Sequence, residues 1–304
     1  MINNKKVAVL LATFNGSRYL REQIDSILCQ ENITIDIYVR DDNSIDETFS
    51  ILEEYRQKNK NFHILDTIKN QLGPGRNFFS ILNEIEIKHY DFISYCDQDD
   101  KWFSNKLYEA VNKIESENVN CYGSNLYIWD GDNVTGILSK SSVQTEYDFL
   151  FESASAGCTL VMDRKSANHL KNEIYKYFDK LTFEISHDWY TYAITRIGSF
   201  KWHIDNRAFI YYRQHNSNQY GANEGFQGIR NKLKLFTNGW YLRNIKMIID
   251  FFCHTKPSFY GLLINYKNLG LIKRIKLAFI ISKYRRELLH RFILFFLLIF
   301  KLIK

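Results

Sequence analysis

Short apolar runs alternate with amphipathic segments through the first hundred residues, and this alternation constrains the fold more than any other feature of the sequence. Four runs predict strands, at residues 7–11, 33–39, 62–65 and 92–95. The segments between them predict helices, at residues 18–29, 46–58 and 77–87. Elements that alternate at this spacing favour a parallel, doubly wound sheet. Right-handed crossovers then bring the loop after each strand to the same edge.

Polar and charged side chains follow each of the four predicted strands. They are Thr13 and Asn15, Asp41 and Asp42, Gly73 and Arg76, and Asp97, Asp99 and Asp100. Open α/β sheets bind ligands at this edge, so we expect these residues to line one cleft. The Asp97-x-Asp99 pair offers oxygen ligands that suit Mg²⁺ or Mn²⁺, and such ions usually join protein carboxylates to substrate phosphates. Taken alone, the pair has an acidic surface turn as its alternative interpretation.

The middle of the chain carries fewer signals. Two further strands are predicted, at residues 121–129 and 209–212. Residues 189–197 predict a helix with Asp188 at or near its N-terminus, where the helix dipole favours a carboxylate. The small residues at 153–159 allow either a close approach of backbone to a ligand or close packing of elements. Trp102 and Trp189 are expected in the core rather than stacked on a ligand.

The charges divide unevenly between the body of the chain and its C-terminal part. The 304 residues include 40 Lys and Arg and 34 Asp and Glu. Residues 226–304 hold 16 of the basic residues and two acidic ones, so this part carries +14 and residues 1–225 carry −8. We therefore expect a main domain over 1–225 and a basic helical region over 226–304. The charge of this region predicts an anionic partner, either a membrane or nucleic acid.

The C-terminal region favours a membrane surface over nucleic acid. Residues 271–304 predict a helix that mixes basic and apolar residues, and 292–300 are nine apolar residues in a row. Nine is less than half of the roughly 20 residues needed to span a bilayer, and basic apolar helices of this kind more often lie on its surface. A core helix flanked by solvated charges is the alternative. No nucleic-acid-binding motif is visible.

The cysteines and the N-terminus favour a cytosolic protein. The five cysteines, at 29, 96, 121, 158 and 253, form no Cys-x-x-Cys pair, so neither a disulfide framework nor a zinc site is predicted. The apolar run at 7–11 is too short for the core of a signal peptide.

The motifs at the predicted loops resemble those of the family 2 glycosyltransferases with the GT-A fold. They are VLLATFNG at 9–16, VRDDNSID at 39–46, NQLGPGRN at 70–77 and YCDQDDKW at 95–102. Three later motifs are similar to the bacterial rhamnosyltransferase-like branch: AGCT at 156–159, HDW at 187–189 and YRQHN at 212–216. The resemblance covers about the first 220 residues. It implies a GT-A catalytic domain, which is an α/β, Rossmann-like fold with a mostly parallel central sheet and flanking helices.

The resemblance implies an inverting transfer of a sugar, with rhamnose favoured, from a nucleotide-diphosphate donor such as dTDP-rhamnose or a UDP-sugar. The acceptor would be a growing cell-surface polysaccharide or a lipid-linked oligosaccharide, met at the inner face of the cell membrane. Mg²⁺ or Mn²⁺ would neutralise the charge that grows on the leaving diphosphate. Inversion needs one general base to deprotonate the acceptor hydroxyl. Nucleic acid is not an expected partner.

The resemblance also implies a role for individual residues. The nucleotide-sugar contacts fall on Thr13, Asn15, Asp41, Asp42, Arg76 and Asp97. The metal ligands fall on Asp99, Asp97 and His215, with Asp100 as a more distant carboxylate. Asp188 is the expected base and Glu184 the second choice, while His187 is expected to orient its neighbours.

Two other functions use related features. A non-catalytic protein of the same fold, which binds nucleotide sugars for assembly, would keep the cleft without the chemistry. A nucleotidyltransferase would normally carry a glycine- and basic-rich loop after the first strand, whereas residues 12–18 contain a single glycine. Retention of all the acidic positions favours the glycosyltransferase over the non-catalytic protein, and the single glycine in the loop favours it over the nucleotidyltransferase.

Overall fold

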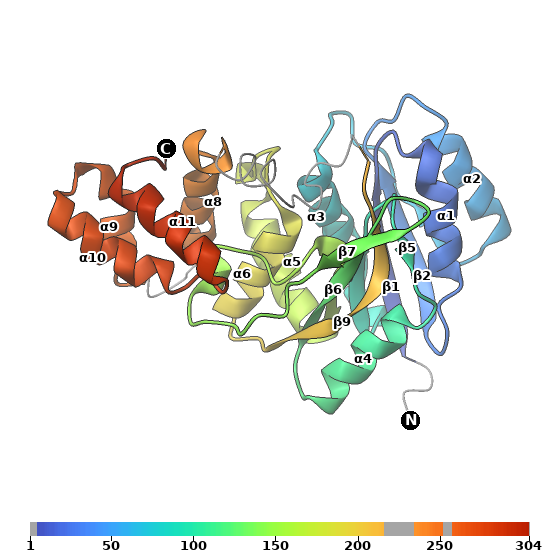
Figure 1. The fold of residues 1–304 in the computed structure, drawn as a ribbon. Coiled ribbons are helices and arrows are strands. Elements are labelled where there is room, and N and C mark those ends of the chain that lie inside the picture. Colours follow the sequence, from blue (N-terminus) through green and yellow to red (C-terminus); the bar gives the residue numbers. More distant parts are fainter. Residues whose placement is uncertain (1–4, 216–233, 252–256, 304) are drawn as a thin grey trace.

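The computed structural model describes residues 5–215, 234–251 and 257–303. Cys253, Asn216 of the YRQHN motif and the boundary expected at residue 225 lie outside these ranges. The described residues form one nine-stranded sheet flanked by helices (Figure 1). This confirms the predicted α/β class.

The N-terminal part of the sheet is parallel, as predicted. Its strands, in the order β3-β2-β1-β4, are β1 (Lys6–Thr13), β2 (Thr34–Asp41), β3 (Phe62–Ile64) and β4 (Phe92–Cys96). The helices between them are α1 (Ser17–Leu28), α2 (Thr48–Lys58) and α3 (Pro74–Glu84). Val7 to Leu11 are fully buried, because a parallel sheet is covered on both faces. In register, Thr13 pairs with Asp41 and Leu11 with Cys96, so these strands end at one edge.

Beyond β4 the sheet is mixed. Its further strands are β5 (Lys101–Trp102), β6 (Cys121–Trp129), β7 (Val134–Leu138), β8 (Val161–Asp163) and β9 (Trp202–Arg213). β8 runs antiparallel to β4 and β6, and β9 runs parallel to β6. β5 pairs antiparallel with β9, so the end of β9 lies beside the acidic loop at residues 97–100, between β4 and β5. The helices of this part are α4 (Lys106–Ser116), α5 (Arg164–Tyr177) and α6 (His187–Ile197).

Several element boundaries differ from the sequence prediction. α3 begins at Pro74 instead of residue 77, because proline fits the first turn of a helix, where its missing N–H costs no hydrogen bond. β9 begins at Trp202 and not at 209. The single helix expected over 271–304 is two helices, α10 (Leu271–Ser282) and α11 (Leu288–Ile299). The chain turns between them so that Tyr284 and Arg286 become buried.

The C-terminal helices pack onto the body of the protein. They begin with α8 (Trp240–Asp250) and α9 (Tyr260–Ile264), and one apolar core continues through α6 into α8, α10 and α11. The centroid of the Trp189 ring lies 5.6 Å from that of Trp240 and 5.4 Å from that of Tyr241. Trp102 and Trp189 are both buried, which confirms their place in the core. Figure 1 shows α9 to α11 at the end of the molecule opposite to α1 and α2.

The described helices of this region are short. Among the described residues, no helix has both the length and the apolar character that crossing a bilayer requires.

A buried cluster of ion pairs also ties the C-terminal helices to the body. Arg286 lies 3.6 Å from Asp148 and 3.6 Å from Glu152, and its backbone N–H donates to Glu152 at 2.7 Å. Arg196 of α6 reaches Asp148 at 3.2 Å, and Arg285 lies 3.7 Å from Glu152. Part of the basic charge of residues 226–304 therefore neutralises acidic groups of the body instead of facing solvent.

One close contact sets α6 against the 3₁₀ turn η3 (Gly157–Thr159). The ring of His187 lies 4.0 Å from the ring of Phe78 and 5.1 Å from that of Tyr95. A Cβ on Gly157 would lie 2.0 Å from His187 Nε2, so glycine is required for this approach. The small residues at 153–159 thus serve close packing at Gly157. His187 Nε2 is buried and has no hydrogen-bond partner among the described residues.

We predict that His187 makes folding stability depend on pH below neutrality. Burial lowers the pKa of His187 from 6.5 to about 4, with the charge of Asp188 opposing the shift. Between these values the unfolded chain binds more protons than the folded one, so stability should fall as pH drops, by up to about 1.4 kcal/mol per pH unit. The free energy of unfolding, measured with urea across this window, should depend less steeply on pH for His187→Gln than for the wild type.

The exposed His89 supplies the control for this experiment. His89→Gln should keep the slope of the wild type. Parallel pH profiles for the wild type and His187→Gln would contradict the prediction.

Candidate active site

The loops after β1 and β2 hold each other through side chains predicted to line the cleft. The hydroxyl of Thr13 donates to Asp41 at 2.9 Å, and Ser44 donates to Asp41 from its N–H at 2.8 Å and its hydroxyl at 2.5 Å. Asn15 has a φ of +46°. Its N–H donates to Ser44 Oγ at 2.8 Å, and its Oδ1 accepts from the N–H of Ile45 at 2.9 Å. Thr13, Asn15 and Asp41 therefore lie together, as predicted.

Asp42 fixes the loop before α3. Its two carboxylate oxygens accept the N–H groups of Leu72 and Gly73, each at 2.8 Å. Gly73 has a φ of +75°, and a Cβ there would lie 2.9 Å from the carbonyl oxygen of Phe183. This loop therefore packs against the segment that leads into α6. The sequence motif did not reveal this anchoring role of Asp42.

Arg76 lies in the first turn of α3, where the sequence predicted a loop. Its guanidinium carbon lies 5.0 Å from the centre of the Phe178 ring. Its Nε is buried and has no hydrogen-bond partner among the described residues. A buried donor without an acceptor is costly, so this group suits an anionic ligand.

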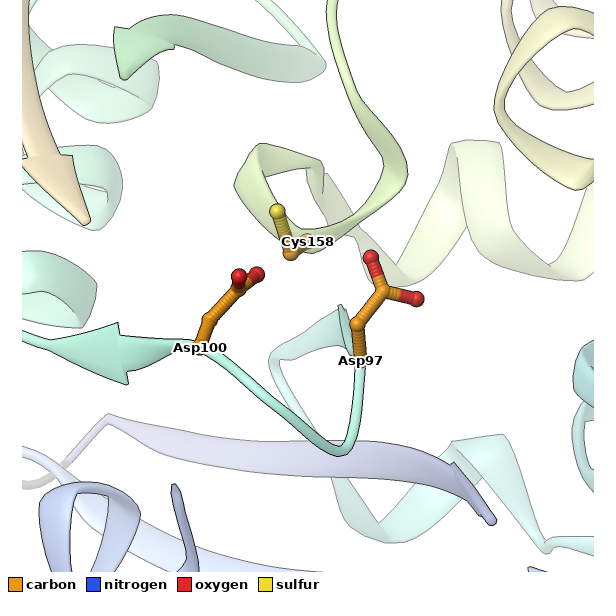
Figure 2. A group of neighbouring side chains, drawn as sticks. All are labelled: Asp97, Asp100 and Cys158. Atoms are coloured by element: carbon orange, nitrogen blue, oxygen red, sulfur yellow. The ribbon is translucent and has the colours of Figure 1, made fainter. Parts of the chain in front are cut away.

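The loop after β4 turns two carboxylates toward η3. Figure 2 shows Asp97 and Asp100 on one side of this loop, with Cys158 of η3 facing them. One ligand atom from each of the three residues lies within 4.8 Å of the others. Asp100 is fully buried; its Oδ1 accepts the N–H of Arg213 at 3.1 Å. Its Oδ2 has no hydrogen-bond partner in the described part of the chain.

Residues at the end of β9 hold the same loop from the other side. Asp99 Oδ2 lies 2.8 Å from Nε2 of His215. Arg213 donates from Nε to the carbonyl oxygen of Asp99 at 2.9 Å. The guanidinium of Arg213 also lies over the rings of Tyr19 and Trp129, at 4.4 and 4.1 Å. The structure thus pairs two of the predicted metal ligands, Asp99 and His215, while Asp97 faces Asp100 and Cys158.

Gln98 joins the acidic loop to the loop after β1. Its Oε1 accepts the N–H of Phe14 at 2.8 Å, and its Nε2 donates to the carbonyl oxygen of Phe14 at 2.9 Å. A Cβ on Gly16 would lie 2.2 Å from Gln98 Oε1, so a larger residue there would displace the Gln98 amide from these bonds. These bonds show directly that the loops after β1 and β4 meet.

The electrostatics of the acidic loop favour a bound cation. Burial, with the charges of Asp99 and Asp188, raises the pKa of Asp97 to about 7. Burial also raises the pKa of Asp100 well above its usual value, and Asp99 and Asp97 add to the shift. A divalent cation would relieve this repulsion and satisfy the unpaired Oδ2 of Asp100, so the residues present fit such an ion.

The thiol of Cys158 is a poor match for Mg²⁺ or Mn²⁺. Burial and the nearby charges of Asp100 and Asp97 raise the pKa of the thiol well above its usual value, so the thiol stays protonated at neutral pH. Hard cations prefer carboxylate oxygens.

Asp188 lies in the first turn of α6, one residue beyond its start, and Ser186 occupies the N-cap position. The N–H of Trp189 donates to Asp188 Oδ1 at 2.7 Å, and the hydroxyl of Ser186 bonds to the same oxygen. Both of these hydrogen bonds go to Oδ1, and neither goes to Oδ2. The charge of Asp188 contributes to the raised pKa of Asp97, so the two carboxylates share one electrostatic site. Glu184 instead pairs with Arg243 at 3.4 Å on an exposed surface.

The sequence predicted no role for three residues of this site. Gln98, Cys158 and Arg213 all lie inside motifs quoted for the family resemblance, but no role followed from their type. Arg213 comes directly after the predicted strand at 209–212, just as the aspartates of the site come soon after earlier strands. This position is the signal that could have identified it.

Solved glycosyltransferase structures share this fold. Staphylococcus aureus TarS 1–349 in complex with UDP-GlcNAc aligns over 92% of this chain and 80% of its own, with a TM-score of 0.52 and 16% identity. The mannosyltransferase PcManGT from Pyrobaculum calidifontis, in complex with GDP-Man and Mn²⁺, aligns over 94% of this chain and 86% of its own, with a TM-score of 0.50 and 14% identity. At these identities the likeness concerns the fold.

Sequence relatives add to this likeness. The dTDP-rhamnosyl transferase RfbG of Shigella flexneri is 32% identical over 278 residues, which cover 91% of this chain and 94% of the relative. The UDP-Glc:alpha-D-GlcNAc-diphosphoundecaprenol beta-1,3-glucosyltransferase WfaP of Escherichia coli is 28% identical over 57% of this chain and 66% of its own. The family profile for glycosyl transferase family 2 matches residues 8–226. The chain therefore belongs to glycosyl transferase family 2 and is a glycosyltransferase of the rhamnosyltransferase-like kind.

Proposed function

We propose that this glycosyltransferase moves a sugar from a nucleotide-diphosphate donor to an acceptor hydroxyl with inversion at the anomeric carbon, using Asp188 as the base. The observation that carries the proposal is the placement of Asp188 beside the acidic loop: the adjacent His187 packs against Tyr95 of β4 and Gly157 of η3, and the charge of Asp188 contributes to the raised pKa of Asp97. dTDP-rhamnose is the favoured donor, because the relative from Shigella flexneri is named a dTDP-rhamnosyl transferase and aligns over almost the whole chain. UDP-sugars are the alternative, since another relative is named for UDP-Glc.

The donor is proposed to lie across the edge where β1, β2 and β4 end. The residues proposed to contact it are Thr13, Asn15, Asp41, Asp42, Arg76 and Asp97. The buried and unpaired Nε of Arg76 supports a contact with an anionic part of the donor. Asp41 already accepts a hydrogen bond from Thr13 at the end of β1, and Asp42 accepts two from the loop before α3, so much of their contribution is to hold the loops in the shape that receives the nucleotide.

Asp97, Asp99 and His215 are proposed to hold a divalent cation, with the carboxylate of Asp100 behind them. A cation bound there supplies Lewis-acid stabilisation of the charge that develops on the leaving diphosphate. The raised pKa of Asp97 and the unpaired Oδ2 of Asp100 support the site. The contact between His215 and Asp99 brings these two proposed ligands together, so both would be close to a cation bound there.

Asp188 performs the proton transfer in this proposal. Its Oδ2 takes the proton of the acceptor hydroxyl while the acceptor oxygen forms a bond to the anomeric carbon. The bond from that carbon to the diphosphate oxygen breaks, and its electron pair leaves with the nucleoside diphosphate. Hydrogen bonds from Trp189 and Ser186 to Oδ1 fix the carboxylate, so that Oδ2 is presented in one orientation.

The acceptor is proposed to be a growing cell-surface polysaccharide or a lipid-linked oligosaccharide. The name of the Escherichia coli relative includes a diphosphoundecaprenol acceptor, which supports a lipid carrier. The basic character of residues 226–304 supports a peripheral position at the inner face of the membrane, where such a carrier would be met.

Replacing the base should separate binding from transfer. Asp188→Asn keeps an Oδ1 acceptor for Trp189 and Ser186 but loses the basic oxygen, so donor affinity should stay near wild type while sugar transfer falls by about 10²–10⁴-fold. Radiolabelled sugar transfer and calorimetric titration of the donor measure the two quantities. Glu184→Gln is the matched control and should transfer sugar at the wild-type rate. Transfer by Asp188→Asn at a near wild-type rate would reject Asp188 as the base.

Metal binding should depend on Asp99 more than on Cys158. Because Mn²⁺ prefers carboxylate oxygen to a protonated thiol, Asp99→Asn should weaken Mn²⁺ binding by about tenfold or more, and Cys158→Ser should leave it nearly unchanged. Electron paramagnetic resonance of free Mn²⁺ measures this without any turnover. The opposite order of the two variants would move the site to the group formed by Asp97, Asp100 and Cys158.

A donor screen tests the sugar assignment. Ligands that bind only the folded state raise its melting temperature, so dTDP-rhamnose with Mg²⁺ should give a larger shift than UDP-glucose or UDP-N-acetylglucosamine at the same concentration. Donor hydrolysis in the same set should follow that order. A larger shift with a UDP-sugar, accompanied by faster hydrolysis, would contradict the assignment to rhamnose.

A further inference from the structure

The outer side of the α10–α11 hairpin exposes an unusual number of large apolar residues. We call this surface the α10–α11 face; it consists of Ile272, Phe279, Leu288, Leu289, Phe292, Phe296 and Phe300, each more than half exposed. Soluble proteins rarely expose so many neighbouring apolar side chains unless the surface binds something.

The apolar residues of α11 form a stripe along one side of the helix. Leu288, Phe292, Phe296 and Phe300 follow one another at a spacing of four residues, which places them on one helix face. Leu294, Leu297 and Leu298, on the other side of α11, are buried in the core. The helix is thus apolar both toward the protein and toward solvent, and the core buries only three of its ten apolar residues.

Aromatic contacts join this stripe to α10. The ring of Phe279 lies 4.8 Å from that of Phe295, and Phe295 lies 5.6 Å from Phe296, between ring centroids. The exposed apolar surface is therefore continuous across the two helices.

The charges around the face are almost all positive. Residues 271–303 contain eight Lys and Arg and one acidic residue, Glu287, which lies 3.1 Å from His290. Arg285 and Arg286 are turned inward to Glu152. The exposed lysines, by contrast, are Lys273, Lys276, Lys283 and Lys301. An apolar surface edged by lysines complements the acyl chains and anionic headgroups of a bilayer.

From these observations we infer that the α10–α11 face is a docking surface for an anionic lipid bilayer and lies flat in its headgroup region. Each helix has 12 residues, or about 18 Å of length, which is well short of the roughly 30 Å of a bilayer core. A symmetric pair of chains through this face would bring two sets of lysines together without acidic partners, so a second copy fits the surface less well.

The hairpin is held rigidly to the catalytic body. The turn between α10 and α11 carries Arg286, which is buried against Asp148 and Glu152, and the core is continuous through α6. Docking of the face therefore holds the cleft at a set height and tilt over the membrane. This consequence rests on the proposed function, because it suits an acceptor that is carried on a lipid.

Sedimentation with vesicles tests the inference on the full chain. Wild-type protein should bind vesicles of phosphatidylglycerol and phosphatidylcholine. The affinity of Phe292→Ser/Phe296→Ser for the same vesicles should be lower by at least about tenfold. Val143→Ser is the control, because it removes a still more exposed apolar side chain outside the face. Lys273→Glu/Lys276→Glu should weaken binding to the anionic vesicles and make it less sensitive to salt.

The same proteins distinguish this inference from the proposed function. A thermal shift with dTDP-rhamnose, measured without vesicles, should be the same in the wild type and in both double variants. A wild type that binds vesicles but no nucleotide sugar would refute the proposed function and leave the docking surface standing. The inference is overturned if wild-type protein does not bind the vesicles or if Phe292→Ser/Phe296→Ser binds them like the wild type. A wild-type dimer that this variant converts to a monomer, with no vesicle binding, would assign the face to a second copy.

Discussion

The carboxylates at the end of β4 repel one another, and much of the surrounding structure serves to hold them together. The buried Asp100 accepts a hydrogen bond from the backbone N–H of Arg213, Asp99 contacts His215, and Gln98 forms hydrogen bonds with the loop after β1. Arg213 is the last residue of β9, and His215 follows two residues later. The pairing of β5 with β9 therefore places both residues beside the acidic loop. The repulsion that remains is the property that suits the loop to a cation and a diphosphate.

Much of this site follows from the sequence through topology. Parallel strands with right-handed crossovers end at one edge, so the meeting of Thr13, Asp41 and the acidic loop was predictable. The partners of Asp42 and the roles of Gln98 and Cys158 were not, because hydrogen bonds between loops depend on backbone positions that periodicity does not determine. α4 and α5 were missed, and the tail helix was split by a turn whose cause, the burial of Arg286 on Asp148 and Glu152, lies more than 130 residues away.

The helix that carries the proposed base and the C-terminal helices are parts of one packed unit. Trp189 follows Asp188 directly and lies against Trp240 and Tyr241 of α8, so α6 is braced by the C-terminal region. The charge asymmetry of the sequence suggested an appendage whose basic residues face outward. The structure divides them instead: Arg285 and Arg286 neutralise the body, while Lys273 and Lys276 of α10 and the nearby Lys283 and Lys301 remain at the surface. A change in the C-terminal region can therefore reach the active site through α6.

The central claim is that one carboxylate, Asp188, activates the acceptor on the face of the sugar opposite the leaving diphosphate. The anomeric configuration of the product, read by NMR from the coupling and shift of the anomeric proton, tests this most directly. A single displacement predicts a glycosidic bond of the opposite anomeric configuration to the donor. A product that keeps the configuration of the donor would require two displacements or a different mechanism, and would contradict the role given to Asp188.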